Sequence, residues 1–128
     1  MALVIAPEQI SDEAARLSIN EIAEFLQQHL GQRMTAYLSG VTDPKMVSRW
    51  IAAQNTPRDE SKMRLREGYQ VVRLLVSVYG NDTAKAWLFG SNTRLDDQAP
   101  AYILRHASNW EDLRFVVPAA RTFAGAAD

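Results

Sequence analysis

The chain contains no cysteine and only two histidines among its 128 residues. The absence of thiols excludes disulfide bonds, thiolate metal sites and a cysteine nucleophile. No apolar run approaches the roughly 18 residues that a membrane-spanning helix needs. The apolar start at residues 1–6 lacks both a basic flank and a small-residue cleavage site, which argues against a signal peptide. We therefore expect a cytoplasmic protein that has no membrane partner.

The residue patterns of an enzyme are also missing. The sequence has no glycine-rich phosphate loop, no zinc-binding histidine pair and no nucleophile elbow. His29 and His106 lie far apart, and we interpret each as a hydrogen-bonded surface or core residue instead of a metal ligand. Asp96 and Asp97 supply too few oxygen ligands for a cation site, so a turn or helix cap is their favoured role. We expect no catalytic residue, no metal and no cofactor.

What remains is an ordinary globular composition, with 47% hydrophobic and 23% charged residues. The length favours one domain, or two small ones that share a core. The net charge of −1 is unevenly distributed, because residues 1–30 hold one basic and five acidic side chains while residues 31–75 hold eight basic and four acidic ones. A basic middle third is typical either of a nucleic-acid-binding surface or of a solvated helix surface.

Hydrophobic residues at helical spacing predict an all-α fold without strands. The expected helices span about 8–17, 19–30, 32–39, 44–53, 59–79, 82–90 and 100–107, with a last helix that begins after Asn109. The second half of the long helix at 59–79 is apolar almost all round, so we expect it at the centre of the core. Pro118 lies inside the last helical pattern and predicts either a kink or a restart there.

Three local signals define where helices begin and how closely they pack. Ser18 and Glu21 have the spacing of a capping box. Asp43 is a good N-cap residue, and the proline that follows it loses no helical hydrogen bond at that position. Gly68 is unfavourable inside a helix, which predicts a close contact with a neighbouring helix.

The helix, glycine turn and helix over 32–53 are the arrangement that places a recognition helix in the major groove of DNA. Ala36 permits a close helix crossing, Gly40 lets the chain reverse, and Val47 and Trp50 anchor the second helix to the core. The residues expected to contact DNA have basic or hydroxyl side chains that pair with phosphates or base edges: Arg33, Thr42, Lys45, Ser48, Arg49 and Arg58. A structural corner with a solvated face is the alternative.

The segment from Gln32 to Trp50, followed by Pro57, resembles the Xre (Cro/repressor-like) helix-turn-helix. In that family a glutamine opens the first helix, a Gly-Val pair forms the turn, and a small residue, arginine and tryptophan end the second helix. The spacing from Gly40 to Val47 is one residue longer than is usual in the family. The resemblance therefore implies a Cro/repressor-like bundle whose turn is rebuilt around Asp43.

The second half of the chain resembles the toxin-binding domain of the Xre/MbcA/ParS antitoxins. The matching residues are Trp87, Leu88, Asn92, Leu95, Pro100 and Leu104. Ser91 replaces a proline of the family motif, and Asp97 stands where glycine is common. Large apolar residues at helical spacing usually pack inside, so we expect Trp87, Leu95 and Leu104 in the core. The two resemblances together cover about residues 30–125.

This resemblance implies an antitoxin that binds a RES-domain toxin, a family that consumes NAD, and covers its active-site cleft. It also implies repression of the antitoxin's own operon by a homodimer bound to operator DNA. The expected toxin contacts are Asn92, Arg94, Arg121 and Phe123. The expected organisation is an N-terminal arm or short helix over 1–17, a helix-turn-helix domain over 18–80 and a small helical toxin-binding domain over 81–128. The alternatives are a transcriptional regulator without a toxin partner and an interaction module that does not contact DNA.

Overall fold

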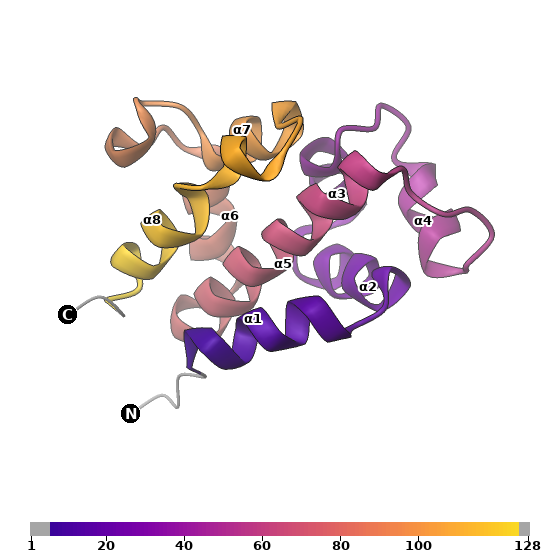
Figure 1. Cartoon of the computed structure of the whole chain (residues 1–128), viewed down its shortest axis with the longest axis horizontal. Helices are drawn as coiled ribbons and strands as arrows, with labels where there is room; N and C mark the ends of the chain where they lie inside the picture. Colours follow the sequence, from indigo (N-terminus) through magenta and orange to yellow (C-terminus); the bar gives the residue numbers. More distant parts are fainter. Residues whose placement is uncertain (1–5, 126–128) are drawn as a thin grey trace.

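The computed structural model describes residues 6–125, and that part of the chain is helical without strands. The helices are α1 (Pro7–Arg16), α2 (Ile19–Leu30), α3 (Gln32–Ser39), α4 (Lys45–Ile51), α5 (Asp59–Tyr79), α6 (Asn81–Phe89), α7 (Pro100–His106) and α8 (Val116–Phe123), with short 3-10 helices η1 (Thr93–Leu95) and η2 (Trp110–Leu113). Helix α4 lies at one end of the molecule, and α8 and the start of α1 lie at the other (Figure 1). The predicted all-α fold is confirmed.

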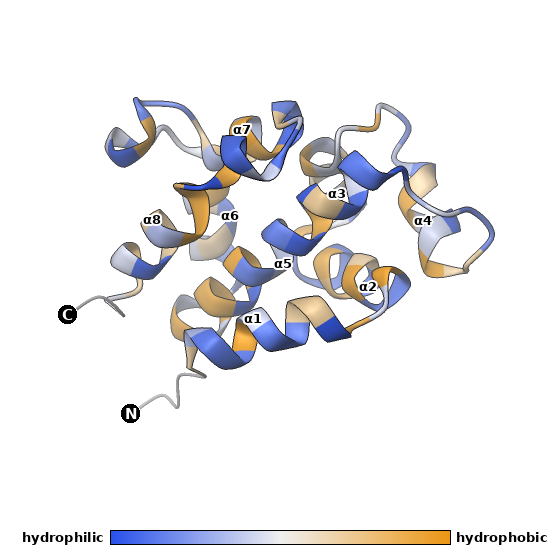
Figure 2. Cartoon of the chain, viewed as in Figure 1, coloured by the Kyte–Doolittle hydropathy of each residue, from blue (hydrophilic) through white to orange (hydrophobic). Residues whose placement is uncertain are grey.

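The long helix α5 runs through the middle of the molecule and forms its core. It contacts α1, α2, α3, α6, α7 and α8. The side chains of Leu65, Val72 and Leu75 are fully buried, whereas the last turn is half-buried and Tyr79 is exposed. The apolar faces of the surrounding helices turn toward α5 (Figure 2). Removal of these faces from water is the main stabilising contribution to the fold, and it joins both halves of the chain in one core.

The predicted caps occur. The backbone N–H of Glu21 donates to Ser18 Oγ at 3.3 Å, and the N–H of Ser18 donates to Glu21 Oε1 at 3.0 Å. The Ser18 hydroxyl also donates to Glu21 Oε1 at 2.8 Å, and this bond, together with the one from the Ser18 N–H, holds the pKa of the Glu21 carboxyl below its usual value. Asp43 Oδ1 accepts from the N–H of Lys45 at 3.0 Å, so its side chain binds the start of α4, although the helix begins one residue later than expected and Pro44 takes the N-cap position.

Gly68 marks the crossing of α5 with α3. A β-carbon at this position would lie 3.1 Å from Leu38 Cδ1, closer than side chains normally pack. Glycine therefore lets Leu38, which is fully buried, lie against the backbone of α5. The close helix contact predicted from Gly68 is confirmed.

The segment after Asn109 corrects one expectation. It forms two helices, because η2 ends at Leu113 and α8 begins at Val116. Asn109 Oδ1 caps η2 by accepting from the N–H of Asp112 at 3.1 Å. Pro118 lies in the first turn of α8, where a missing N–H leaves no helical hydrogen bond unmade. A single last helix is therefore wrong, and the restart at the proline is right.

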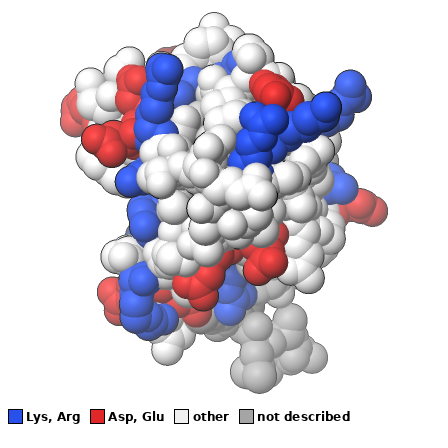
Figure 3. Space-filling view, turned by 90° about the vertical axis from the view of Figure 1, so that its right-hand side faces the viewer, with Lys and Arg blue, Asp and Glu red and all other residues white. Residues whose placement is uncertain are grey.

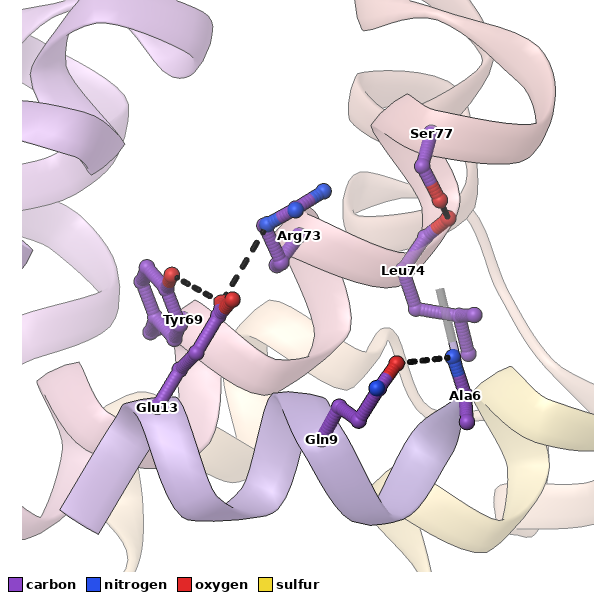
Figure 4. Close-up of polar contacts among 7 residues, drawn as sticks. All are labelled: Ala6, Gln9, Glu13, Tyr69, Arg73, Leu74 and Ser77. Carbon is purple, nitrogen blue, oxygen red and sulfur yellow. Dashed lines mark hydrogen bonds and ion pairs between the residues drawn. The ribbon is translucent and has the colours of Figure 1, made fainter. Parts of the chain in front are cut away.

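Helix α1 is joined to α5 by polar contacts. The carboxylate of Glu13 accepts a hydrogen bond of 2.8 Å from the Tyr69 hydroxyl and pairs with Arg73 Nε at 3.3 Å (Figure 4). Arg66 Nη1 donates to the backbone carbonyls of Ala14 and Leu17 at 2.6 and 2.9 Å. The first helix is therefore fixed on the core from Pro7 onward, while residues 1–5 lie outside the described part of the chain.

Candidate functional site

The first candidate site is the helix-turn-helix formed by α3, residues 40–44 and α4. Gly40 ends α3 with φ at +92°, and its N–H and that of Val41 both donate to the carbonyl of Ala36 at 3.2 Å. Val47 and Trp50 are buried, and α4 contacts both α2 and α3. One side of α4 is therefore fixed in the core, and its other side faces solvent.

All six residues predicted to contact DNA lie at the surface: Arg33, Thr42, Lys45, Ser48, Arg49 and Arg58 are exposed. Within residues 6–125, none of the four basic ones forms an ion pair. Gln32 Nε2 donates to Ser48 Oγ at 2.5 Å, which links the first turn of α3 to the exposed side of α4. These charges are therefore free to contact a polyanion.

The face of the molecule that carries α4 has both signs of charge. Figure 3 shows Lys and Arg side chains on it with Asp and Glu side chains between them. A groove of about 620 Å³ beside the turn is lined by Asp43 and Glu60 as well as by Arg58. The face is therefore of mixed charge and is not uniformly basic.

Three of the basic side chains of the middle third have partners inside the molecule. Arg66 and Arg73 hold α1, as described above. Arg64 Nη1 donates to the carbonyl of Ser39 at 3.2 Å, and its Nε and Nη2 donate to the carbonyl of Ala107 at 3.1 and 2.7 Å. The positive charge at 31–75 is thus partly structural, which the sequence did not reveal because the carbonyl partners are remote along the chain.

The turn is also held from α7. Arg105 Nη1 donates to the carbonyl of Tyr37 at 2.8 Å and to that of Val41 at 3.4 Å. Its guanidinium lies 4.7 Å from the centre of the Tyr37 ring. Arg105 thus adds a second donor to the Tyr37 carbonyl, which also accepts from the N–H of Gly40 at 3.1 Å, while Arg64 bonds the carbonyl of Ser39 at the end of α3. Sequence reasoning missed both residues, since an arginine carries no signal of which carbonyl it will reach.

The second candidate site is the surface expected to bind a toxin. Asn92, Arg94 and Phe123 line one hollow of about 320 Å³ together with Trp87. Arg121 lies elsewhere, in a crevice between α8, α1 and α5 that Ile10 also lines. The structure therefore brings three of the four predicted residues together and separates Arg121 from them.

A buried carboxyl lies within electrostatic reach of Arg121. Glu67 on α5 is 7% exposed. Burial raises the pKa of the Glu67 carboxyl to about 7, although the positive charge of Arg121 opposes that shift. The observation points to an electrostatic role for Arg121 in the contact between α5 and α8.

Sequence reasoning also missed a set of exposed aromatic side chains. Tyr102, Trp110 and Phe115 are 45%, 57% and 59% exposed. Tyr102 and Phe115 border a hollow of about 520 Å³ between η1, α7 and η2. Helical spacing indicates burial for large apolar residues, so only the tertiary structure identifies them as surface. Trp87, Leu95 and Leu104 are buried, as predicted.

Neither histidine belongs to a metal site in the described residues. His29 Nδ1 is 2.9 Å from Asn81 Oδ1, and His106 Nδ1 is 2.9 Å from the carbonyl of Tyr102. Between residues 6 and 125, no three His, Asp or Glu side chains lie close enough together to hold a metal ion. In the same range, no helix has the length and apolar character needed to cross a membrane.

Comparison with known proteins finds similarity to an antitoxin. The chain is 37% identical over 62 residues to the mycobacterial cidal antitoxin MbcA of Mycobacterium bovis and of two strains of Mycobacterium tuberculosis. The matched residues are 48% of this chain and 55% of the MbcA chain, so the chain spans about half the length of the curated relatives it matches. No protein-family profile matches the chain. No solved structure matches it. The similarity confirms the predicted resemblance to MbcA/Xre-type antitoxins.

Proposed function

We propose that this protein is an antitoxin, which binds a toxin through its C-terminal half and DNA through α3 and α4. The observation that carries the proposal is the similarity to MbcA, a protein named as an antitoxin. The order of a helix-turn-helix followed by exposed apolar hollows supports it. In this proposal residues 18–80 bind DNA and residues 81–128 bind the toxin. Helix α1 packs against α5 and stabilises it.

The toxin is a RES-domain protein, and inhibition occurs by steric occlusion of its active-site cleft. The hollow at Asn92, Arg94 and Phe123 supports a protein partner, because it combines an exposed aromatic ring with a free guanidinium. Arginine and aromatic residues dominate the energetics of protein interfaces. Affinity is then set by a few anchors of this kind and not by the total buried area.

The DNA partner is the operator of the protein's own operon. Lys45, Ser48 and Arg49 on the exposed side of α4 contact base edges and phosphates, and Arg33 on α3 and Arg58 after α4 contact phosphates. A helix of seven residues reads few base pairs, so specific binding requires a homodimer on two half-sites. Autoregulation of this kind takes place in the cytoplasm.

The test is co-expression with the protein encoded by the adjacent open reading frame. We expect that growth is lost when this chain is omitted and that a tag on this chain purifies a stoichiometric complex. The matched control is a variant of the neighbouring protein with an inactivated RES active site. We expect it to leave growth unaffected whether or not this chain is co-expressed. If the neighbour is not toxic and is not retained, the antitoxin proposal is wrong.

The second candidate function is a transcriptional regulator without a toxin partner. The free cations on α4 favour it independently of the C-terminal half. In that case the chain binds its own promoter in a mobility-shift assay, while co-expression has no effect on growth.

A further inference from the structure

Three hollows, lined mostly by residues of the second half of the chain, lie next to one another and share lining residues. The first, of about 410 Å³, lies between α3, α6 and the start of α7. It shares Gln98 and Tyr102 with the hollow of about 520 Å³ between η1, α7 and η2. That hollow shares Arg94 with the one of about 320 Å³ beside α8. We call this surface the C-terminal belt, defined by the ridges Tyr102 and Arg94 and the rim residues Phe115 and Phe123.

The belt carries exposed aromatic rings. Of the five large hydrophobic side chains that are exposed within residues 6–125, three border it: Tyr102, Phe115 and Phe123. None of the five lies on α2, α3 or α4, so the highly exposed large hydrophobic side chains are absent from these helices. Aromatic rings gain free energy when a partner covers them, which makes them typical anchors of protein interfaces.

Arg94 is the free positive charge of the belt. Its backbone N–H donates to Asn92 Oδ1 at 3.0 Å, and the next residue, Leu95, is buried, so the turn that carries Arg94 is fixed on both sides. The guanidinium is exposed and, within the described residues, forms no hydrogen bond or ion pair; Asp96, which lines the same hollow, does not pair with it. An unpaired guanidinium on a turn whose backbone is held in place is suited to bind a carboxylate through two parallel hydrogen bonds.

Arg114, the other arginine of this surface, is already engaged. Its Nη1 donates to the carbonyl of Glu111 at 2.7 Å and pairs with the Glu111 carboxylate at 3.3 Å. Its guanidinium lies 4.5 Å from the centre of the Phe115 ring, which supports that ring in its exposed position. Asp112 is engaged as well, because Oδ2 accepts from the N–H of Ser108 at 2.9 Å. The belt therefore presents one unpaired arginine, Arg94, between the exposed rings of Phe115 and Phe123.

We propose that the toxin covers the whole C-terminal belt, with a toxin carboxylate bound to Arg94 and toxin apolar side chains in the hollows at Tyr102 and Phe123. The inference rests on the proposed antitoxin function. It extends the proposed toxin-binding surface from the hollow beside Phe123 to the two hollows bordered by Tyr102. It makes Tyr102 and Phe115 toxin contacts and leaves Arg121, which lines a separate crevice, outside the interface. A partner with an acidic residue between apolar ones matches the charge and apolar character of this surface.

The test measures the affinity of the neighbouring toxin, in its inactive form, for variants of the full chain by calorimetry. Arg94→Glu places a negative charge opposite the toxin carboxylate, and we expect the dissociation constant to rise at least ~30-fold, the loss typical of an interface hot spot. Tyr102→Ala combined with Phe115→Ser is expected to raise it at least ~10-fold. The control Arg16→Glu reverses an exposed arginine on α1, far from the belt, and is expected to leave the affinity unchanged.

All substituted side chains are exposed, so each variant is expected to fold, and thermal unfolding verifies this. If Arg94→Glu and the aromatic double variant bind the toxin as tightly as the wild type, the belt is not the interface, although the antitoxin function still holds. If they change only the self-association of this chain, a second copy covers the belt and the proposal is wrong. If the wild-type chain does not bind the toxin at all, both proposals are wrong.

Discussion

Arg105 on α7 donates a hydrogen bond of 2.8 Å to the backbone carbonyl of Tyr37 on α3, and its guanidinium lies over the Tyr37 ring. The carbonyl belongs to the last turn of α3, next to the turn that leads into α4. A helix of the second half of the chain thus fixes the end of the first helix of the helix-turn-helix. The contact joins the proposed toxin-binding half, which contains Arg105, to the proposed DNA-binding half, which contains Tyr37.

Truncation of Arg105 is expected to destabilise the protein. Arg105→Ala leaves the carbonyls of Tyr37 and Val41 without this donor and removes the contact with the ring. We expect the free energy of unfolding to fall by about 2 kcal/mol in urea titrations. Arg16→Ala, an exposed arginine without a described contact, is the control and is expected to change it by less than about 0.5 kcal/mol. Equal stabilities of the two variants would contradict the role of Arg105.

Gly40 is expected to tolerate alanine less well than Gly31. Both have φ near +90°, but Gly40 (ψ 9°) lies in the left-handed helical region and Gly31 (ψ 164°) in a region that is almost restricted to glycine. Backbone strain therefore costs an alanine about 1–3 kcal/mol at either position. At Gly31 a β-carbon meets open space, whereas at Gly40 it overlaps Nη1 of Arg64. Arg64 would have to give up its hydrogen bond to Ser39, at a further cost of about 1–3 kcal/mol. Chemical denaturation of the two variants measures the difference, and the prediction fails if Gly31→Ala is as destabilised as Gly40→Ala.

Glu67 is expected to make stability depend on pH. Its carboxyl keeps its proton to about pH 7 in the folded protein, while the unfolded chain releases it near the ordinary pKa of 4.5. Since the folded state binds the proton more tightly, this contribution to stability is complete below pH 4.5 and is lost as the pH rises to about 7. The loss amounts to at most about 3 kcal/mol.

Glu67→Gln removes this titration and keeps the shape of the side chain. We expect the variant to be more stable than the wild type at pH 8 and to differ little from it near pH 4.5, as measured by the unfolding midpoint at each pH. A difference between variant and wild type that does not change with pH would show that the Glu67 carboxyl does not titrate in this way.

Lys45 and Arg49 are expected to carry much of the DNA affinity. The double variant Lys45→Ala, Arg49→Ala removes two exposed charges from α4 without affecting its buried side. We expect weaker operator binding in mobility shifts. A plot of log affinity against log salt concentration should be less steep by about two phosphate contacts per protomer, or about four for the homodimer. Arg16→Ala serves again as a control. Unchanged binding by the double variant would place the DNA contact elsewhere.

Most helix positions were predictable because their signals are local. The capping pairs Ser18–Glu21 and Asp43–Lys45 form hydrogen bonds between residues two or three positions apart, and the α5 bounds follow from apolar spacing. The corner of the helix-turn-helix follows from Gly40 and from the buried Val47 and Trp50. The restart at Pro118 was one of two possibilities, and the proline alone does not choose between them.

The sequence by itself thus determined an all-helical chain with a corner between α3 and α4 and an exposed basic side on α4. Only the tertiary structure decided which charges and which aromatic rings remain at the surface. Arg64 and Arg105 reach carbonyls that lie 43 and 68 residues away, and Arg121 lines a crevice between α1, α5 and α8 instead of joining Arg94. Such pairings depend on how helices cross in space, because a side chain takes a partner across the core only after packing has brought the two elements together.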